Sequence, residues 1–202
     1  MNPPAPVVDY FLAPNSPWTY LGHQRFLDIA QAAGAQVRLR PMDLAQVFPV
    51  SGGLPLPKRA PQRQAYRLVE LRRFADALQM PLNLQPRHFP VAADAAARLL
   101  VAVAEHDGQA AALRLAGAVL AAVWVHERDI ADPGCLATLL AETGLPAERL
   151  AQSAAPEVQA AYQAHTQAAI DAGVFGSPSY VIDGEIFWGQ DRLDFVQRRL
   201  GV

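Results

Sequence analysis

The chain has 202 residues, of which 51% are hydrophobic, and its formal net charge is -2 at neutral pH. This length suffices for one sizeable core, or for a small domain that carries a large insertion. Because the charges nearly balance and the arginines are scattered, no field steers the chain toward nucleic acid or an anionic membrane. The composition therefore excludes a nucleic-acid-binding or membrane-surface protein and favours small partners.

Further classes of protein and of site are excluded by motifs that the sequence lacks. Residues 1–6 lack the basic and apolar regions of an export signal, so we expect a cytoplasmic protein. The longest apolar stretch, residues 109–125, is shorter than the roughly 20 residues that cross a bilayer. The single cysteine, Cys135, excludes an internal disulfide, and the histidines show no metal-ligand spacing. We therefore expect no metal site.

The first forty residues alternate between strand and helix patterns. Residues 7–12 form a short apolar run that is typical of a buried strand. A helix is predicted to begin at Pro17, because proline suits the first helical position and Ser16 is a good N-cap. Gly34 is expected to end it, and alternating residues 36–40 predict a second strand. Two strands joined by a helix in this way indicate an α/β sheet.

The middle of the chain, residues 44–165, contains no segment that is typical of a strand and is dominated by alanine, leucine and arginine. Residues 52–61 and 81–90 are rich in proline or glycine and predict irregular loops, which often line sites. Between these loops, residues 66–78 predict an arginine-rich amphipathic helix. Residues 113–125 are apolar nearly all round and predict the most buried helix.

Strand patterns return after the helical block. Residues 179–183 predict a strand, Asp183-Gly184 a hairpin turn, and residues 185–188 the partner strand. A helix over residues 191–200 is expected to close the chain.

The order of these elements predicts the fold class. It is β-α-β, a run of helices, then β-β-α, which is an α/β thioredoxin-like fold with a large all-helical insertion domain. We expect residues 1–43 and 166–202 to form the thioredoxin-like domain. Residues 44–165 are expected to form the insertion.

Residues 15–18, Asn-Ser-Pro-Trp, lie where the first strand turns into the first helix. Open α/β sheets bind ligands at this edge, and a helix N-terminus stabilises a thiolate. A redox enzyme would carry a cysteine here. The Ser16 hydroxyl instead can donate a hydrogen bond to a sulfur of another molecule, but it cannot exchange disulfides. On this motif alone, a serine in this place is more often only a helix cap.

Two later turns could complete a site with Ser16. Pro178 directly precedes a strand that must be central, where a trans proline fits poorly, so a cis Ser177–Pro178 bond is favoured over an ordinary turn proline. That bond would leave the Ser177 N–H and C=O for an extended ligand. Asp191, where a strand runs into the closing helix, is predicted to cap that helix, to accept from a ligand ammonium, or both.

Four motifs carry a family resemblance that extends over nearly the whole chain. They are Ser16-Pro17-Trp18-x-Tyr20-Leu21-Gly22, Trp124-x4-Asp129-Ile130, Gly173-Val174-Phe175-Gly176-Ser177-Pro178 and Phe187-Trp188-Gly189-Gln190-Asp191-Arg192-Leu193. Each is weak alone, and together in this order they are strong. The chain resembles the 2-hydroxychromene-2-carboxylate isomerases and the similar kappa-class glutathione transferases.

The resemblance implies a glutathione site with Ser16 as the catalytic residue, which hydrogen-bonds the glutathione sulfur. It implies that Ser177 pairs with the cysteinyl backbone and that Gln190 and Asp191 hold the γ-glutamyl end. The other residues that it implies around glutathione are Pro17, Trp18, Gly53, Arg63 and Pro178, and those around the substrate are Trp188, Tyr20 and Lys58. Either Lys58 or Arg63 would supply a basic contact to glutathione, with Arg63 favoured.

Two positions depart from the pattern of many relatives. Gly53 stands where a loop asparagine is usual, and Ala92 replaces a later asparagine. Both departures fall in segments that contribute to the site in those relatives.

The resemblance implies an isomerase that interconverts 2-hydroxychromene-2-carboxylate and trans-o-hydroxybenzylidenepyruvate in the breakdown of naphthalene-type aromatic compounds. The glutathione thiolate would add transiently to the conjugated ketone and be expelled after rotation. A kappa-class-like glutathione transferase with the same site is the first alternative, and a non-catalytic thioredoxin-like binding module is the second. A small aromatic substrate and a homodimer are also implied.

Overall fold

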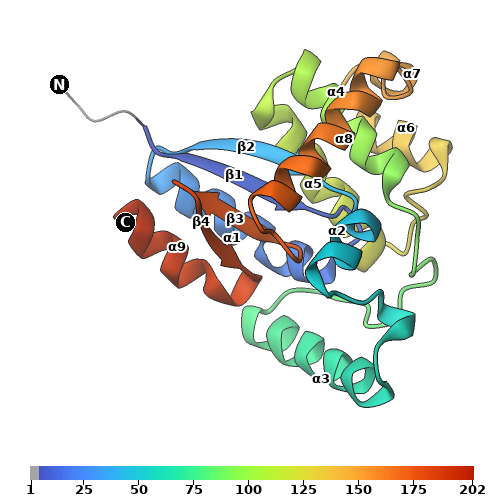
Figure 1. The fold of residues 1–202 in the computed structure, drawn as a ribbon. Helices are drawn as coiled ribbons and strands as arrows, with labels where there is room; N and C mark the ends of the chain where they lie inside the picture. Colours follow the sequence, from blue (N-terminus) through green and yellow to red (C-terminus); the bar gives the residue numbers. More distant parts are fainter. Residues whose placement is uncertain (1–4) are drawn as a thin grey trace.

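A computed structural model describes residues 5–202 (Figure 1). The expectation of no export signal rests on residues 1–6, and of these residues 1–4 lie outside the described part. The elements are β1 (Val7–Leu12), α1 (Pro17–Ala32), β2 (Gln36–Pro41), α2 (Leu44–Ser51), the 3₁₀ helix η1 (Leu56–Lys58), α3 (Pro61–Leu78), α4 (Asp94–His106), α5 (Gln109–Trp124), α6 (Pro133–Glu142), α7 (Glu148–Gln152), α8 (Pro156–Asp171), β3 (Ser179–Ile182), β4 (Glu185–Trp188), the 3₁₀ helix η2 (Gln190–Arg192) and α9 (Leu193–Leu200).

The four strands form one mixed sheet in the order β2-β1-β3-β4. β1 and β2 are parallel, whereas β3 is antiparallel to both β1 and β4. Asp183 and Gly184 both have positive φ in the turn between β3 and β4, as the predicted hairpin requires. Within residues 5–202, no strand lies between β2 and β3. The predicted thioredoxin-like fold with helices in its middle is therefore confirmed.

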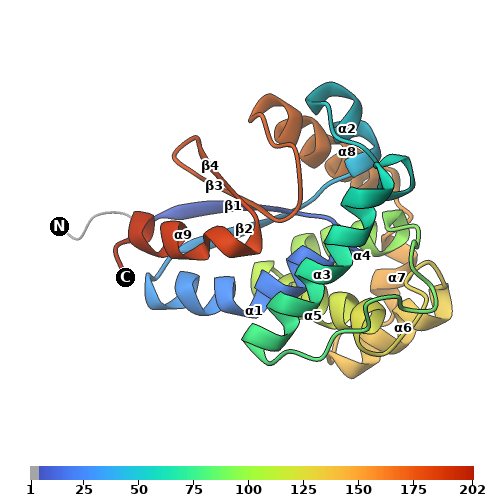
Figure 2. The same ribbon diagram turned by 90° about the horizontal axis from the view of Figure 1, so that it is seen from below.

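The two faces of the sheet pack against different helices, as alternate residues of a strand point to opposite sides. Tyr10 of β1 packs with Phe26 of α1 in the main hydrophobic cluster, and Phe11 packs on the other face in a second cluster with Val47 of α2 and Ala169 of α8. Figure 2 shows α1 and α9 on one side of β1, and α2 and α8 on the other. The start of α1 thus lies at the end of β1, an inner strand of the sheet, and α1 is packed against β1 through Tyr10 and Phe26.

The helical block is joined closely to the sheet. The main hydrophobic cluster contains Tyr10 and Phe26 as well as Leu100 of α4 and Trp124 of α5. The expected division at residues 165/166 falls inside α8. The division of the chain into a thioredoxin-like domain and a helical insertion domain stays a prediction.

Two predicted helix starts were wrong. α3 begins at Pro61, five residues before the predicted start, because proline at the first helical position presets φ and its missing N–H costs nothing there. The closing helix begins at Leu193 after the turn of η2, and its N-cap position is Arg192. Asp191 therefore does not cap α9. Its carboxylate instead accepts a hydrogen bond from Arg192 Nη1 at 2.6 Å.

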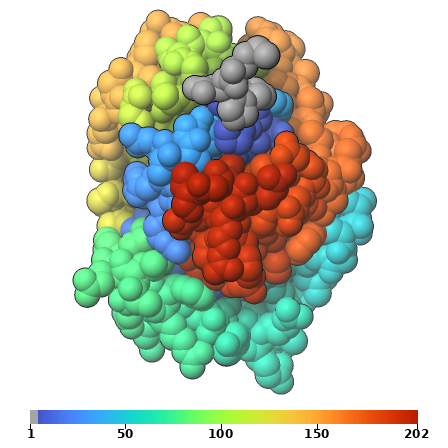
Figure 3. Space-filling model, turned by 90° about the vertical axis from the view of Figure 1, so that its left-hand side faces the viewer, coloured from blue at the N-terminus to red at the C-terminus, as the bar shows by residue number. Residues whose placement is uncertain are grey.

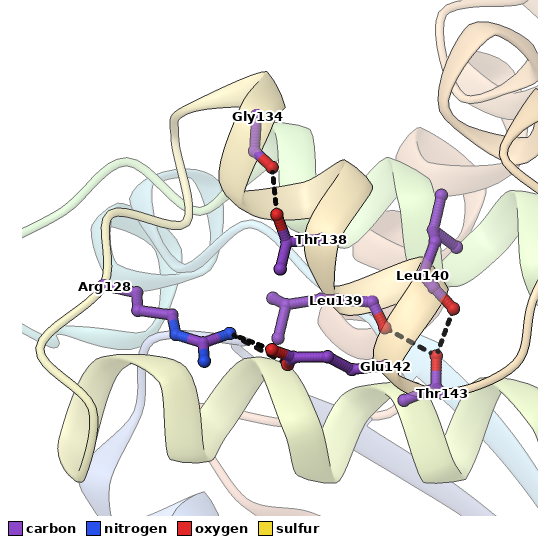
Figure 4. Close-up of polar contacts among 7 residues, drawn as sticks. All are labelled: Arg128, Gly134, Thr138, Leu139, Leu140, Glu142 and Thr143. Atoms are coloured by element: carbon purple, nitrogen blue, oxygen red, sulfur yellow. Dashed lines mark hydrogen bonds and ion pairs between the residues drawn. The ribbon is translucent and has the colours of Figure 1, made fainter.

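The single cysteine lies in α6, and Figure 4 shows polar contacts of this helix, among them the Thr138 hydroxyl with the Gly134 carbonyl. The Asp132 carboxylate caps this helix by accepting from the Cys135 N–H at 3.0 Å. At the other end, Arg128 donates twice to Glu142, and Thr143 Oγ1 donates to the last carbonyls. Burial raises the pKa of the Cys135 thiol, which is the opposite of what a reactive cysteine needs.

Among residues 5–202, no helix is both long and apolar enough to cross a membrane.

Candidate active site

Two adjoining cavities open beside the start of α1. The first, of about 750 Å³, we call the Ser16 cavity, and the second, of about 540 Å³, the Asp191 cavity. Residues that line both are Trp18, Arg59, Arg63, Arg67, Ser177 and Trp188. The Asp191 cavity lies between α3 and the connection from β4 to α9. Figure 3 shows the red surface of the C-terminal elements bordering the green surface of α3. The two cavities thus form one site with two compartments.

Ser16 lies at the N-terminus of α1 and lines the Ser16 cavity. Its Oγ accepts a hydrogen bond from the Thr19 N–H at 3.2 Å, which confirms the predicted helix cap. The hydroxyl donates to the Ser177 carbonyl oxygen at 3.3 Å. Because O–H···O bonds are usually 2.7–2.8 Å long, this contact is weak, and the proton is readily redirected to a better acceptor.

Ser177 is fixed by two buried partners on the opposite turn. Its Oγ accepts from the Ala13 N–H at 2.8 Å and lies 2.7 Å from Thr19 Oγ1. Thr19 is fully buried, so this hydrogen bond is shielded from water. These contacts join the turn after β1 to the turn before β3. The distance between the Ser16 hydroxyl and the Ser177 backbone is therefore set by the fold.

The Ser177–Pro178 peptide bond is cis, as predicted. Within residues 5–202, the Ser177 N–H has no protein acceptor. The Pro178 carbonyl accepts from the Gly189 N–H at 2.9 Å, which fixes the loop that leads to Asp191. Pro178 itself lines neither cavity, so its part in the site is to shape the backbone.

Gln190 and Asp191 both line the Asp191 cavity, but their side chains are engaged differently. Gln190 is 1% exposed, and its Oε1 accepts from Arg25 Nη1 of α1 at 2.9 Å. Its side-chain oxygen is thus turned toward α1. The Asp191 carboxylate is half-exposed beside Arg192 and can accept from a ligand ammonium. The Gln190 Nε2 is buried and has no hydrogen-bond partner among the described residues, so the Gln190 amide keeps a donor while Asp191 offers an acceptor.

Gly22 allows α1 to approach η2 closely. A Cβ at Gly22 would lie 2.7 Å from Gln190 Cβ and 3.3 Å from Gln190 Cα. Gly22→Ala is expected to push η2 outward and to lower the free energy of unfolding by about 1–3 kcal/mol, as overpacking does. Urea denaturation measures the loss. Gln31→Ala, an exposed change on the same helix, is the control, and equal stability of the two variants would contradict this prediction.

Three arginines line the Ser16 cavity. Burial and the charge of Arg63 lower the pKa of Arg59, whereas burial and the charge of Arg59 lower the pKa of Arg67 to about 10. Arg59 and Arg67 remain charged at neutral pH in spite of these shifts. No aspartate or glutamate is among the residues that line this cavity within the described part of the chain. The cavity is thus suited to an anion.

Aromatic side chains form the rest of the walls. Trp18 packs edge-on against Phe74 of α3, and Phe175 packs edge-on against Trp188 with ring centroids 4.8 Å apart. Trp188 is held close by Gly176, where an added Cβ would overlap the indole nitrogen. These rings give the cavity flat apolar surfaces for an unsaturated ligand.

Most of the predicted site residues lie together. Those that line one or both cavities are Ser16, Pro17, Trp18, Gly53, Arg63, Ser177, Trp188, Gln190 and Asp191. Tyr20 and Lys58 line neither cavity. The Tyr20 hydroxyl donates to the Pro81 carbonyl at 2.7 Å, and Lys58 is exposed on η1. The structure does not bring these two residues to the cavities, because α1 turns Tyr20 toward the loop that follows α3, and their part in a substrate pocket stays a prediction.

Several lining residues were not predicted from the sequence. The unpredicted residues that line the Ser16 cavity include Phe48, Arg59, Arg67 and Phe89. Thr19 does not line the cavity, but its hydroxyl is hydrogen-bonded to the Ser177 hydroxyl. One signal was available, since Arg63 and Arg67 are four residues apart and such side chains share a helix face, whereas Arg59 precedes α3.

Phe48 accounts for the glycine at position 53. A Cβ added at Gly53 would overlap the Phe48 ring, so this loop has no room for an asparagine while Phe48 keeps its place. Ala92 is exposed and lines neither cavity.

No group of three or more His, Cys, Asp or Glu side chains in residues 5–202 is arranged to hold a metal ion.

Comparison with known proteins decides the family. The model of the DSBA-like thioredoxin domain matches residues 7–201. The chain belongs to this family. A Pseudomonas putida protein named 2-hydroxychromene-2-carboxylate isomerase is 30% identical, covering 96% of this chain and 94% of its own. Human glutathione S-transferase kappa 1 is 27% identical, covering 100% of this chain and 93% of its own.

The same likeness is found among solved structures. A structure of selenomethionyl 2-hydroxychromene-2-carboxylate isomerase superposes with a TM-score of 0.79 at 26% identity, and the match covers 96% of this chain and 94% of that chain. Together these relatives support an enzyme of the isomerase or glutathione transferase type within the DSBA-like family.

Proposed function

We propose that this protein is a glutathione-dependent isomerase that interconverts 2-hydroxychromene-2-carboxylate and trans-o-hydroxybenzylidenepyruvate. The observation that carries the proposal is the Ser16 hydroxyl at the N-terminus of α1, weakly bonded to Ser177 at the wall of the cavity. The only cysteine of the chain lies in α6, so no thiol of the protein serves this site. A sulfur must then come from a small molecule.

The residues present fit glutathione. The Ser177 N–H without a protein acceptor beside a cis proline suits the backbone of an extended peptide. The Asp191 cavity carries both Asp191 and arginines, which suits a ligand with an ammonium and carboxylates. Ser16 would hold the sulfur, Ser177 the cysteinyl backbone and Asp191 the γ-glutamyl ammonium.

The residues of the chain have three tasks in such a reaction. Glutathione supplies a thiolate that adds to the conjugated ketone, frees the double bond to rotate and is then expelled. Ser16 turns its proton from Ser177 toward the sulfur, and the N-terminus of α1 favours negative charge there. A free thiol has a pKa near about 8.5, so both effects are needed to favour thiolate at neutral pH. The arginines and rings orient the electrophile.

The direct test follows conversion of the hydroxychromene carboxylate by absorbance, with and without glutathione, beside a standard conjugation assay. Isomerisation that requires glutathione, with no net consumption of it, supports the proposal. Conjugation without isomerisation would favour a kappa-like transferase, for which the human relative is the specific reason. Absence of both reactions and of glutathione binding would leave the non-catalytic binding module.

Glutathione is expected to stabilise the protein against heat. A ligand at a hundred times its Kd adds about 2.7 kcal/mol to the free energy of unfolding, which for a chain of this size raises Tm by about 5–10 °C. Differential scanning calorimetry measures the shift, with γ-glutamyl-free cysteinylglycine as the control. An unchanged Tm at millimolar glutathione contradicts the expectation.

A further inference from the structure

One side chain of the Ser16 cavity carries a charge that the protein leaves unpaired. Arg67 lies on α3, with its guanidinium carbon 5.3 Å from the centre of the Phe89 ring and 5.7 Å from that of Trp124. These distances are typical of cation–π contacts, which hold the flat guanidinium against the rings. Its Nη2 is buried and has no hydrogen-bond partner among the described residues. A buried charged donor is normally paired, and no hydrogen bond or ion pair joins the other guanidinium nitrogens of Arg67 to a described residue, so a ligand in the cavity can bind them.

The neighbouring arginines do not meet this description. Arg59 Nε already donates to the Leu54 carbonyl at 2.8 Å, and Arg63 is exposed. Phe89, against which Arg67 stacks, lines the Ser16 cavity and not the Asp191 cavity. Among the three arginines, Arg67 is therefore the one that stacks on a ring of the Ser16 cavity.

The surroundings of Arg67 indicate the chemistry of its ligand. Phe48, Phe89 and Pro90 give an apolar wall, and no acidic side chain of the described residues lines this compartment to neutralise the guanidinium. A planar guanidinium matches a carboxylate with two parallel hydrogen bonds. A flat, unsaturated body with one carboxylate would bury its apolar part on the rings and its charge on Arg67.

We propose that Arg67 binds the carboxylate of the electrophilic substrate and selects anionic over uncharged electrophiles. This inference rests on the proposed function, because it assigns the part of the substrate that Ser16 and glutathione do not hold. Burial, together with the charge of Arg59, lowers the pKa of Arg67 to about 10, so the side chain stays charged at neutral pH. A bound carboxylate would supply the counter-charge that the protein omits.

The test uses two probes that differ in charge and little in shape, trans-cinnamate and trans-cinnamamide. Calorimetric titration of the full chain is expected to show cinnamate binding at least about tenfold more tightly. Arg67→Gln should remove this preference while cinnamamide affinity stays within about twofold. Arg72→Gln is the matched control, because Arg72 is exposed on the same helix and lines neither cavity. This variant should bind both probes as the wild type does.

The outcomes separate this inference from the proposed function. Equal affinity of the wild type for both probes, or a preference that survives in a folded Arg67→Gln protein, overturns the inference. Loss of glutathione binding in Arg67→Gln also overturns it, because Arg67 would then belong to the glutathione compartment. If the cinnamate preference depends on Arg67 but no isomerisation occurs, the proposed function fails and carboxylate binding stands.

Kinetics give a second measure where isomerisation occurs. The substrate carboxylate carries its charge before the reaction and throughout it, so a contact with it stabilises ground state and transition state alike, and Arg67→Gln should raise KM about tenfold or more with a smaller effect on kcat. A variant that lowers kcat alone, with KM unchanged, overturns the assignment. Thermal unfolding of Arg67→Gln verifies that the fold is intact.

Discussion

Ser16→Ala is expected to lower kcat for glutathione-dependent isomerisation by about 100- to 1000-fold, the usual effect of removing one hydrogen-bond donor from a developing anion. The hydroxyl is the side-chain donor at the N-terminus of α1, and its present bond to Ser177 is long enough to be given up. Because the thiolate loses this donor, the apparent thiol pKa in the pH–rate profile should also rise. Steady-state kinetics over a range of pH measure both effects.

The same substitution removes a helix cap, so the cost of capping must be measured separately. Asp132→Ala is the matched control, since Asp132 caps α6 through the Cys135 N–H and lines neither the Ser16 nor the Asp191 cavity. Both variants should lose about 1 kcal/mol of stability, and only Ser16→Ala should lose activity. Ser16→Thr, which keeps a hydroxyl, should recover part of the rate. Full activity of Ser16→Ala would refute the role given to this side chain.

A different substitution tests whether the absence of a thiol at position 16 is what separates isomerisation from disulfide exchange. Ser16→Cys would place a thiol at a helix N-terminus, where its pKa falls and its reactivity rises. This variant is expected to form a mixed disulfide with oxidised glutathione and to lose isomerisation in parallel. Intact-mass measurement detects the added glutathionyl group. The wild type, treated in the same way, should gain none at position 16.

The fold was predictable from the sequence because its main signals are local. Pro17 after a capping serine starts α1, and Asp183-Gly184 makes the hairpin turn, as the structure confirms. The start of α9 was misplaced because η2 packs against α1 at Gly22, a contact that no local pattern reveals. The course of α8 through the expected domain boundary likewise depends on packing.

Site residues could be predicted from the sequence where their place in the fold alone brings them together. Ser16 and Ser177 were found because both turns lie at one edge of the sheet, and the structure joins them by a hydrogen bond. Tyr20 was expected near the substrate on resemblance alone, whereas its hydroxyl donates to the Pro81 carbonyl, because side-chain direction on a helix depends on what the helix packs against. Arg67 was missed since its role depends on Phe89, which is distant in sequence.

Acidification from pH 6.5 to pH 5 is expected to destabilise the protein by about 1 kcal/mol per pH unit for each buried histidine that the fold keeps neutral. His23 of α1 is such a residue. Its Nε2 lies 3.0 Å from the Leu113 carbonyl and must donate to it, so its Nδ1 accepts from the Tyr10 hydroxyl at 3.1 Å. Burial lowers the pKa of His23 to about 4, against about 6.5 in the unfolded chain.

The sign follows from proton binding. Between pH 6.5 and 4 the unfolded chain binds a proton at His23 that the folded protein does not, so stability rises with pH in this window and falls on acidification. Burial, with the charge of Arg40, likewise lowers the pKa of His165 to about 4. The carboxyl of Asp107 acts at lower pH, because its pKa lies below its ordinary value beside Arg149. Hydrogen bonds from Arg73 and Arg128 likewise lower the pKa values of Glu70 and Glu142, which act in the same acidic range as Asp107, so the histidines dominate the slope above pH 5.

His23→Gln is the informative variant, because a carboxamide can still donate to the Leu113 carbonyl and accept from Tyr10 but cannot be protonated. Urea denaturation at pH 6.5, 5.75 and 5 should give a slope about half that of the wild type, and the double variant with His165→Gln should be nearly flat. His126→Gln, at an exposed position, should keep the wild-type slope. Because His23 ties α1 to both β1 and α5, its protonation would loosen the helix that carries Ser16. Equal slopes for wild type and His23→Gln would mean that the folded protein accepts this proton, and that α1 is anchored less tightly than its hydrogen bonds indicate.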